Sequence, residues 1–327
     1  MTLELDRPAA LAPGRPIPSG SALAPRGRRL SRGGVSGSAG GDDTAGSAHS
    51  AGRLRRSLAV TLPLLRRPGF VIAGGYLLGV GVAAVAPSLI APLDPTATVP
   101  EAKLSPPAIG SWFGTDELGR DLFSRVIHGS TLSIEAALLA VGIAIVAGLV
   151  FGVLSGFIGG IVDAVVMRIV DVMLAIPALL LALAIITAIG FGTLPVAVAV
   201  GIGIVPGFAR TTRAEVLRVK SLPYIEAARV GGASWLRILF THVLPNSWGP
   251  VAVLAVLDVG AAIIAAASLS FLGFGAAPPA AEWGTLIADG RNFLITAPWV
   301  SLIPGLFVVL VVLSLNHVAR TLDEVRR

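Results

Sequence analysis

The chain has 327 residues, of which 54% are hydrophobic and 13% charged, and it contains no cysteine, which excludes disulfides and thiolate chemistry. A water-soluble domain carries about a quarter charged residues, so the composition excludes an ordinary soluble domain and indicates lipid as the solvent. The formal net charge of +6 comes from arginines that flank apolar segments, a pattern that membrane topology explains without nucleic acid as a partner.

Residues 1–57 are rich in Gly, Ser, Pro, Ala and Arg and show no apolar periodicity. Such a segment cannot bury enough surface to offset the entropy of ordering it, so we predict a disordered cytoplasmic arm. The alternative is a secretory signal cleaved near Ala84-Val85-Ala86, but the arm is too long and the apolar run too extended for one.

Residues 66–324 contain the apolar segments. A bilayer core of roughly 30 Å takes about 20 apolar residues per helix. Six spans can be drawn, at residues 70–93, 132–157, 161–189, 194–208, 248–271 and 299–315. Pro177 lies in the third and is expected to kink it. The sequence therefore predicts an all-α polytopic membrane protein with six transmembrane helices.

Arginine placement predicts the orientation, because cytoplasmic loops carry an excess of Lys and Arg. Basic residues cluster at 53–67, at 210–237 and at 320–327. Six crossings put all three clusters, and both termini, in the cytoplasm, whereas five or seven would separate the basic ends. The segment 211–246 is then a cytoplasmic loop.

Small residues recur at four-residue spacing, at Gly75 and Gly79 and at Gly152, Gly156 and Gly160. Lipid offers no hydrophobic drive for helix pairing, so glycine is expected to let helices approach closely. Packing within the chain is the favoured interpretation, and contact with a second membrane subunit is the alternative.

The cytoplasmic loop has the punctuation of two short helices at an angle. Ser221 is expected to cap the first helix, with Pro223 in its first turn and Gly231-Gly232 at its end. Ser234 is expected to cap a second helix that stops before Pro245. The exposed face of the pair is predicted to be apolar and to consist of Leu222, Tyr224, Ile225, Ala227 and Ala228.

An apolar tip of this kind suits a groove on another protein. An amphipathic helix lying on anionic lipid headgroups would have a similar composition, and the flanking arginines also favour it. Spacing and composition leave both interpretations open.

The succession Glu226-Ala227-Ala228, Gly232 and Leu244-Pro245 resembles the EAA signature of ABC-importer permeases, although His242 stands where many members carry isoleucine. The resemblance extends over about 66–324 and implies the type I ABC-importer permease fold. It also implies that the loop couples the chain to an ATPase. The residues of this predicted coupling loop are Leu222, Tyr224, Glu226, Ala227, Ala228, Gly232, Leu244 and Pro245.

Residues 114–125 resemble the conserved segment of the second permease of dipeptide, oligopeptide and nickel importers, and residues 159–177 and 269–284 agree with that branch. The alternating Asp and Arg can pair internally and hold the external face rigid, and direct contact with substrate is the alternative. The candidate residues are Gly114, Thr115, Asp116, Gly119, Arg120, Asp121, Ser124 and Arg125. Ala266 stands where many relatives carry glutamate, so no polar role is carried over to it.

Asp258 lies inside the predicted fifth span, where a carboxylate is costly and by default a functional candidate. A structural hydrogen bond to a neighbouring helix or to a partner subunit is the alternative. Further candidate polar residues of the third span are Asp163, Arg168 and Asp171.

The sequence contains no Gly-x-x-x-x-Gly-Lys-Ser/Thr loop and no recognisable nucleophile, acid–base pair or metal-ligand set. The resemblance therefore implies a non-catalytic subunit that binds no cofactor, with ATP and Mg on partner ATPase subunits. Its further implied partners are a homologous permease, an extracytoplasmic binding protein and a peptide substrate, in a bacterial inner membrane. Import of nickel or another small solute is the alternative within this class. Outside it, the alternatives are an ion-coupled secondary transporter, which would show inverted repeats and more mid-membrane charge, and a structural or sensory membrane protein.

Overall fold

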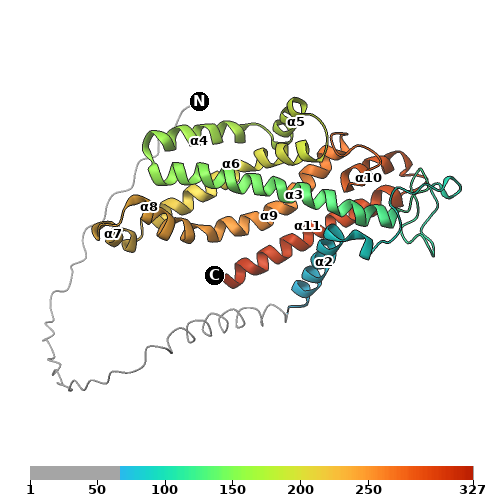
Figure 1. The fold of residues 1–327 in the computed structure, drawn as a ribbon, viewed down its shortest axis with the longest axis horizontal. Helices are drawn as coiled ribbons and strands as arrows, with labels where there is room; N and C mark the ends of the chain where they lie inside the picture. Colours follow the sequence, from blue (N-terminus) through green and yellow to red (C-terminus); the bar gives the residue numbers. More distant parts are fainter. Residues whose placement is uncertain (1–66, 327) are drawn as a thin grey trace, which may run out of the picture. The chain divides into compact units, whose positions relative to one another are not determined.

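The computed structural model describes residues 67–326, which form a bundle of helices (Figure 1). The predicted arm at residues 1–57 lies outside the described residues. Within residues 67–326, five helices are long and apolar enough to cross a membrane, and the number reaches the predicted six when a bent pair of helices is counted as one span. The prediction of an all-α polytopic architecture is confirmed.

The long helices are α2 (Pro68–Val85), α3 (Leu122–Val153), α6 (Thr193–Lys220), α9 (Leu244–Phe271) and α11 (Trp299–Arg326). The short helices are α4 (Gly160–Ala175), α5 (Ala178–Ile189), α7 (Pro223–Val230), α8 (Trp235–Ile238) and α10 (Trp283–Gly290). Two π-turns, Leu154–Ile158 and Leu239–Val243, follow α3 and α8. Single 3₁₀ turns lie at Pro87–Leu89, Pro100–Ala102 and Arg291–Phe293.

Helix ends differ from the predicted span ends because polar caps and prolines, as well as hydropathy, decide them. The second long helix begins at Leu122, ahead of the apolar run, since the Asp121 side chain accepts a hydrogen bond from the Ser124 backbone N–H at 2.8 Å. The first ends at Val85, just before Pro87 opens a 3₁₀ turn. Helix α6 continues past the predicted span end to Lys220.

The predicted kink at Pro177 is confirmed. Helices α4 and α5 meet at 97°, and Ile176 between them has the extended conformation that a residue before proline prefers. Pro177 itself caps the start of α5. The third apolar segment is therefore two helices in different directions.

Helices α3 and α6 pack most closely, and glycine makes this possible. A Cβ at Gly152 would lie 2.5 Å from the Thr212 Cβ, and one at Gly156 would lie 2.9 Å from a Val216 methyl group. This confirms packing within the chain at both glycines. At Gly75 and Gly79, by contrast, a Cβ would meet nothing within 4 Å among the described residues.

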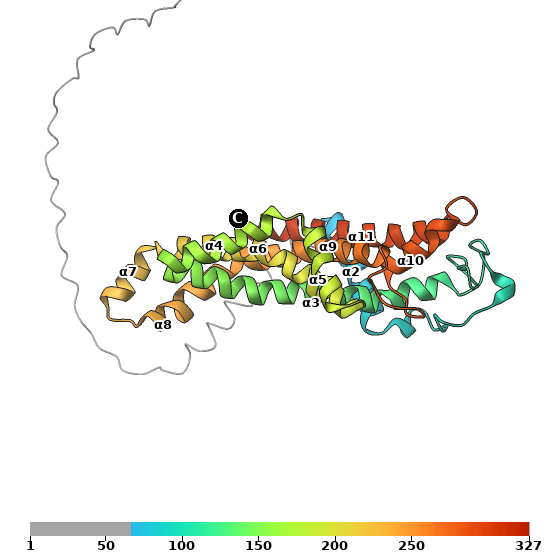
Figure 2. The same cartoon turned by 90° about the horizontal axis from the view of Figure 1, so that it is seen from above.

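Helix α10 is fastened to α3 by Trp283, whose side chain is fully buried. Its indole Nε1 donates to the Val126 carbonyl at 3.0 Å, and its backbone N–H donates to Ser133 Oγ at 3.1 Å. Figure 2 shows α10 and the loop before α3 at one end of the helices, and α7 with α8 at the other. The hairpin and the loop before α3 therefore lie at opposite ends of the bundle.

Candidate functional site

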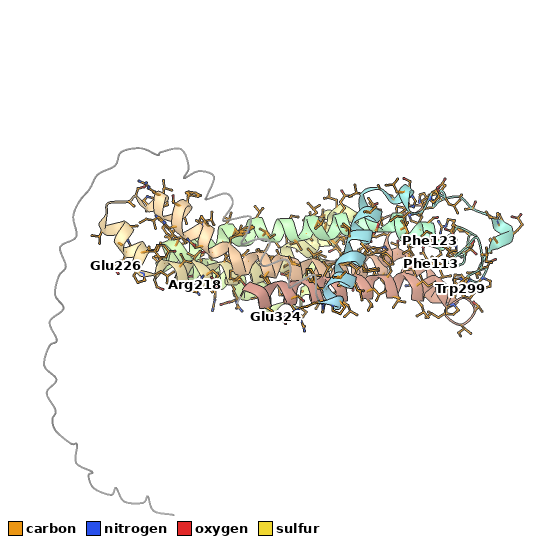
Figure 3. All side chains as sticks on the ribbon, turned by 90° about the horizontal axis from the view of Figure 1, so that it is seen from below. Phe113, Phe123, Arg218, Glu226, Trp299 and Glu324 are labelled. Atoms are coloured by element: carbon orange, nitrogen blue, oxygen red, sulfur yellow. The ribbon has the colours of Figure 1, made fainter. Side chains whose placement is uncertain are left out.

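Helices α7 and α8 form a hairpin at one end of the bundle, with Glu226 near its tip (Figure 3). Pro223 is in the first turn of α7, as predicted, and the Ser234 hydroxyl caps α8 by accepting from the Arg237 N–H at 3.4 Å. The predicted cap at Ser221 is wrong. Leu222 is the cap residue of α7, and the Ser221 hydroxyl donates to the Arg218 carbonyl at 2.9 Å, at the end of α6.

The turn between the two helices depends on Gly232, whose φ is +81°. An L side chain rarely adopts this left-handed conformation, and glycine adopts it freely. The Ala233 N–H then reaches back to the Ala228 carbonyl at 3.0 Å, which satisfies one of the last carbonyls of α7. The prediction that glycine ends this helix is confirmed.

The second helix does not stop before Pro245, contrary to the prediction. A π-turn at Leu239–Val243 connects α8 directly to α9, and Pro245 is in the first turn of α9. Proline lacks an N–H and crowds the preceding turn, and the wider π-turn accommodates it without a break. The hairpin is therefore continuous with a membrane-spanning helix, with Leu244 half-buried and Pro245 exposed at the junction.

Ile225 anchors the hairpin and does not belong to its exposed face, which corrects the prediction. Its side chain is 1% exposed. It packs in a separate apolar cluster of Val216, Val219, Ile225, Ile238, Leu239 and Val243, lined by Val153, Phe157, Leu222 and Ala233. The cluster joins α7 to the ends of α3 and α6 and to the π-turn that leads into α9, so movement of α7 would press on these segments.

The exposed face of the hairpin holds Glu226, Tyr224 and Ala227, with Ala228 half-buried. It also holds large apolar side chains that the sequence reasoning missed: Val230, Trp235, Leu236 and Phe240. Val230 is 84% exposed. Their position beside the Gly231-Gly232 turn was the signal that could have identified them. So large an exposed apolar surface around one carboxylate is typical of a site that contacts another protein or the membrane surface.

Asp163 on α4 and Arg213 on α6 join these two helices. Arg213 donates from Nε to Oδ1 and from Nη2 to Oδ2 of Asp163, each at 2.6 Å, and Ser155 of the π-turn donates to the same carboxylate. Asp171 pairs with Arg210 at 2.5 Å on the same two helices. Both predicted aspartates thus have partners, whereas Arg168 is exposed and makes no hydrogen bond or ion pair within residues 67–326.

At the opposite end, Asp116 lies at the centre of a buried polar cluster. Its carboxylate accepts from Arg120 Nε at 2.7 Å and lies 3.3 Å from Arg125 Nε. Oδ1 also accepts the Leu118 and Arg120 backbone N–H groups at 2.9 and 3.0 Å. The predicted internal pairing of this segment is present, and it is almost fully shielded from solvent.

The remaining residues of this segment close the loop around that cluster. Thr115 accepts the Ser105 N–H at 2.9 Å and donates to the Ala102 carbonyl, while Ser124 donates from its hydroxyl to the capping Asp121 at 2.7 Å. Gly114 and Gly119 have φ of +75° and +78°. The loop is consequently a fixed structure and not a flexible connector.

Asp258 and Glu282 are two acidic residues that are at least half-buried. Asp258 is half-buried on α9 and makes no hydrogen bond or ion pair with any residue from 67 to 326, so the structural bond considered from the sequence is not found within that part of the chain. Glu282, which the sequence reasoning missed, is 1% exposed. It accepts from Ser270 Oγ at 2.7 Å and from the Ala276 N–H at 2.9 Å, and so holds the loop between α9 and α10.

The described helices form an α-helical membrane bundle with an exposed helical hairpin at one end. Residues 148–325 match the family of the binding-protein-dependent transport system inner membrane component, and the chain belongs to this family. It is therefore a permease subunit of an ABC importer, a transport component. A binding protein and an ATPase are the partners that this class implies.

Individual relatives agree. The chain is 42% identical over 236 residues to the di/tripeptide transport system permease protein DppC of Pseudomonas aeruginosa, covering 69% of this chain and 77% of the relative. It is 43% identical over 247 residues to the glutathione transport system permease protein GsiD of Salmonella paratyphi A, covering 75% and 82%. A chain of the MetNI methionine ABC transporter in an inward-facing conformation shares the fold, with a TM-score of 0.51, 22% identity, and coverage of 62% and 97%.

Proposed function

We propose that this chain is one half of a heterodimeric permease that imports short peptides, working beside a homologous permease. The chain itself is non-catalytic in this proposal. ATP and Mg are bound by partner ATPase subunits, and an extracytoplasmic binding protein delivers the peptide. The names of the relatives, which refer to dipeptides, tripeptides and glutathione, support a short peptide as cargo.

The observation that carries the proposal is the exposed carboxylate of Glu226 on a hairpin whose other face is anchored by buried Ile225. An exposed apolar surface on a firmly packed support can transmit a push, because a packed cluster moves as a unit. Closure of an ATPase against Glu226 and its neighbours would displace the ends of α3, α6 and α9 together.

The proposed orientation puts the hairpin and both chain ends in the cytoplasm. Arg67 Nη1 lies 2.6 Å from Glu324 Oε2, which supports placing the start of α2 and the end of α11 on the same side of the membrane. That placement would require an even number of crossings. The basic residues of α6 and the hairpin support the cytoplasm as that side.

Asp258 is proposed to face the translocation path or the partner permease. A carboxylate within an apolar helix needs a partner, and it has none in the described part of this chain. Replacement by Asn should then lower peptide uptake. Wild-type uptake and wild-type ATPase activity in Asp258→Asn would remove this assignment.

The test is Glu226→Lys in the complete transporter reconstituted in liposomes with its binding protein. We expect peptide uptake to fall at least about tenfold. The substitution reverses the charge that the hairpin presents to the ATPase, and a loss of charge complementarity opposes association. ATP hydrolysis should lose its dependence on the peptide-loaded binding protein. Glu101→Lys, an exposed acid at the other end, is the matched control and should leave both quantities unchanged.

The same vesicles separate the cargo alternatives. Uptake of labelled dipeptide in competition with unlabelled dipeptide, but not with Ni²⁺, supports the peptide assignment. Uptake of Ni²⁺ in place of dipeptide would contradict it while leaving the coupling role of the hairpin intact. Unchanged uptake in Glu226→Lys would contradict the coupling role.

A further inference from the structure

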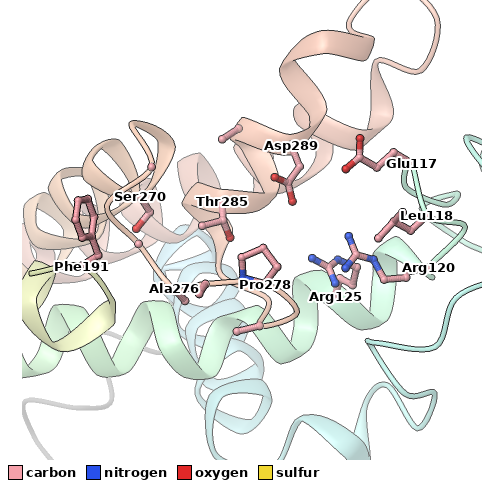
Figure 4. Close-up of a pocket in the computed structure, with 15 residues that line it drawn as sticks. Glu117, Leu118, Arg120, Arg125, Phe191, Ser270, Ala276, Pro278, Thr285 and Asp289 are labelled. Atoms are coloured by element: carbon pink, nitrogen blue, oxygen red, sulfur yellow. The ribbon is translucent and has the colours of Figure 1, made fainter.

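A cavity of about 440 Å³ lies at the end of the bundle opposite the hairpin, between the loop before α3, the loop after α9, and α10 (Figure 4). Its size is within the usual range for small-molecule sites. Its wall carries two arginines, Arg120 and Arg125, and two acids, Glu117 and Asp289. Neither the coupling hairpin nor the α3–α6 packing uses this cavity.

The arginine side of the cavity has an excess of buried positive charge. Arg120 and Arg125 are both almost fully buried, and they share the single carboxylate of Asp116. Arg125 Nε is completely buried 3.3 Å from Asp116 Oδ2 and Nη1 donates to the Pro95 carbonyl at 3.2 Å, whereas Nη2 makes no hydrogen bond within residues 67–326. A buried guanidinium without its full set of acceptors favours an added anion, and a carboxylate suits its geometry.

The acidic side faces the arginines across the cavity, as Figure 4 shows. Asp289 on α10 and Glu117 on the loop before α3 make no hydrogen bond or ion pair within residues 67–326, and both are exposed to the cavity. Partial burial raises the pKa of Asp289, and the neighbouring Arg125 and Arg120 oppose that rise. A ligand ammonium group would find these carboxylates unoccupied.

The walls are preformed, because both sides are fastened to the bundle. Glu282 holds the loop after α9 through Ser270 and Ala276, as described above, and Trp283 fixes α10 on α3. The ring of Phe191 stacks on Phe274 at 5.4 Å and forms an apolar part of the lining. Rigid walls lower the entropic cost of binding a ligand.

We infer that this cavity binds a short zwitterionic ligand, the free termini of a peptide, with the carboxylate at Arg120 and Arg125 and the ammonium at Asp289 and Glu117. This inference rests on the proposed import of peptides and deepens it. The cavity would hold the peptide at the end of the permease where the binding protein releases it. Opposite charges within one cavity would select for both free termini at once.

The test measures binding of trialanine to the complete transporter in lipid nanodiscs without the binding protein, by saturation-transfer NMR and competition. Trialanine with free termini should bind. N-acetylated trialanine and trialanine amide should each bind about tenfold more weakly, since each loses one charge-assisted contact. Equal binding of all three compounds would overturn the inference.

The Asp289→Asn variant tests whether Asp289 contacts the ammonium group of the ligand. Asp289 has no ion pair within the described residues, so its isosteric replacement should not disturb the fold. The variant should bind free trialanine about tenfold more weakly and bind N-acetylated trialanine as the wild type does. Equal loss for both compounds would indicate a merely structural effect and overturn the assignment. Glu101→Gln, outside the cavity, is the control and should change neither.

Failure here is distinguishable from failure of the proposed function. If the reconstituted transporter with its binding protein imports trialanine but the nanodisc sample shows no binding, the cavity inference is wrong and peptide import stands. If trialanine is neither imported nor bound, both are wrong. Binding with the expected preference for free termini, together with import, supports both.

Discussion

Arg213 and Asp163, fifty positions apart, form a bidentate ion pair. Arg213 Nε lies 2.6 Å from Asp163 Oδ1, and Arg213 Nη2 lies 2.6 Å from Asp163 Oδ2. Through it α4 is tied to α6, just before α6 leads into the hairpin. Two parallel charge-assisted hydrogen bonds impose a fixed geometry as well as energy. The pair therefore restrains the bent third segment against the helix that leads into the hairpin.

A double-mutant cycle with Asp163→Asn and Arg213→Gln should give a coupling energy of about 1 kcal/mol, reduced from that of a buried pair because both side chains are partly exposed. Thermal unfolding in detergent, followed by circular dichroism, measures it. The control is Glu215 with Arg218, a pair within α6 that joins no second helix. A coupling no larger than in that control would contradict the role assigned to the pair.

Ile225→Ala should loosen the hairpin. It removes a buried side chain from the cluster that holds α7, at a cost of about 2–4 kcal/mol. We expect faster hydrogen exchange in residues 223–243 and ATP hydrolysis with less peptide uptake per ATP. For hydrogen exchange, Val230→Ala on the same helix is the matched control, since Val230 is highly exposed and its truncation leaves no cavity. Equal exchange in the two variants would show that Ile225 is not the anchor.

Gly232→Ala should destabilise the hairpin turn by about 1 kcal/mol, because alanine is strained at positive φ. The cost is conformational, since a Cβ there would meet nothing within 4 Å in the described chain. Gly232→Asn should lose less than Gly232→Ala, as Asn visits the left-handed region more easily. Gly231→Ala, at a φ of −70°, is the control. Thermal unfolding ranks the three variants, and an Asn variant no better than Ala would contradict the explanation.

Gly119→Ala should damage the loop before α3 much more severely. A Cβ at this position would lie 1.9 Å from the Val99 carbonyl oxygen, in addition to the strain of a φ of +78°. We expect a loss of about 3 kcal/mol, the sum of overpacking and strain. Gly110→Ala, which has positive φ and open space around it, should lose about 1 kcal/mol from strain alone. Similar melting temperatures for the two variants would mean that the close approach to Val99 is relieved at little cost.

The sequence predicted the features that follow from local chemistry. Hydropathy and length located the apolar helices, the conformational limits of proline predicted the bend at Pro177, and the Gly231-Gly232 pair predicted the end of α7. The internal pairing around Asp116 followed from alternating charges. Each of these depends on residues near one another in the chain, so local physics was sufficient.

The tertiary structure decided what depends on distant residues. It placed Ile225 inward, because α6, α8 and the following π-turn close over it, and a short helix does not reveal which face will be covered. It carried α8 through Pro245 into α9, because a π-turn absorbed the proline. It also brought Asp289 opposite Arg125 across one cavity, although the two residues are far apart in sequence and lie on different helices, α10 and α3. Side-chain burial and long-range charge pairing arise from the packing of separate helices, which no local pattern encodes.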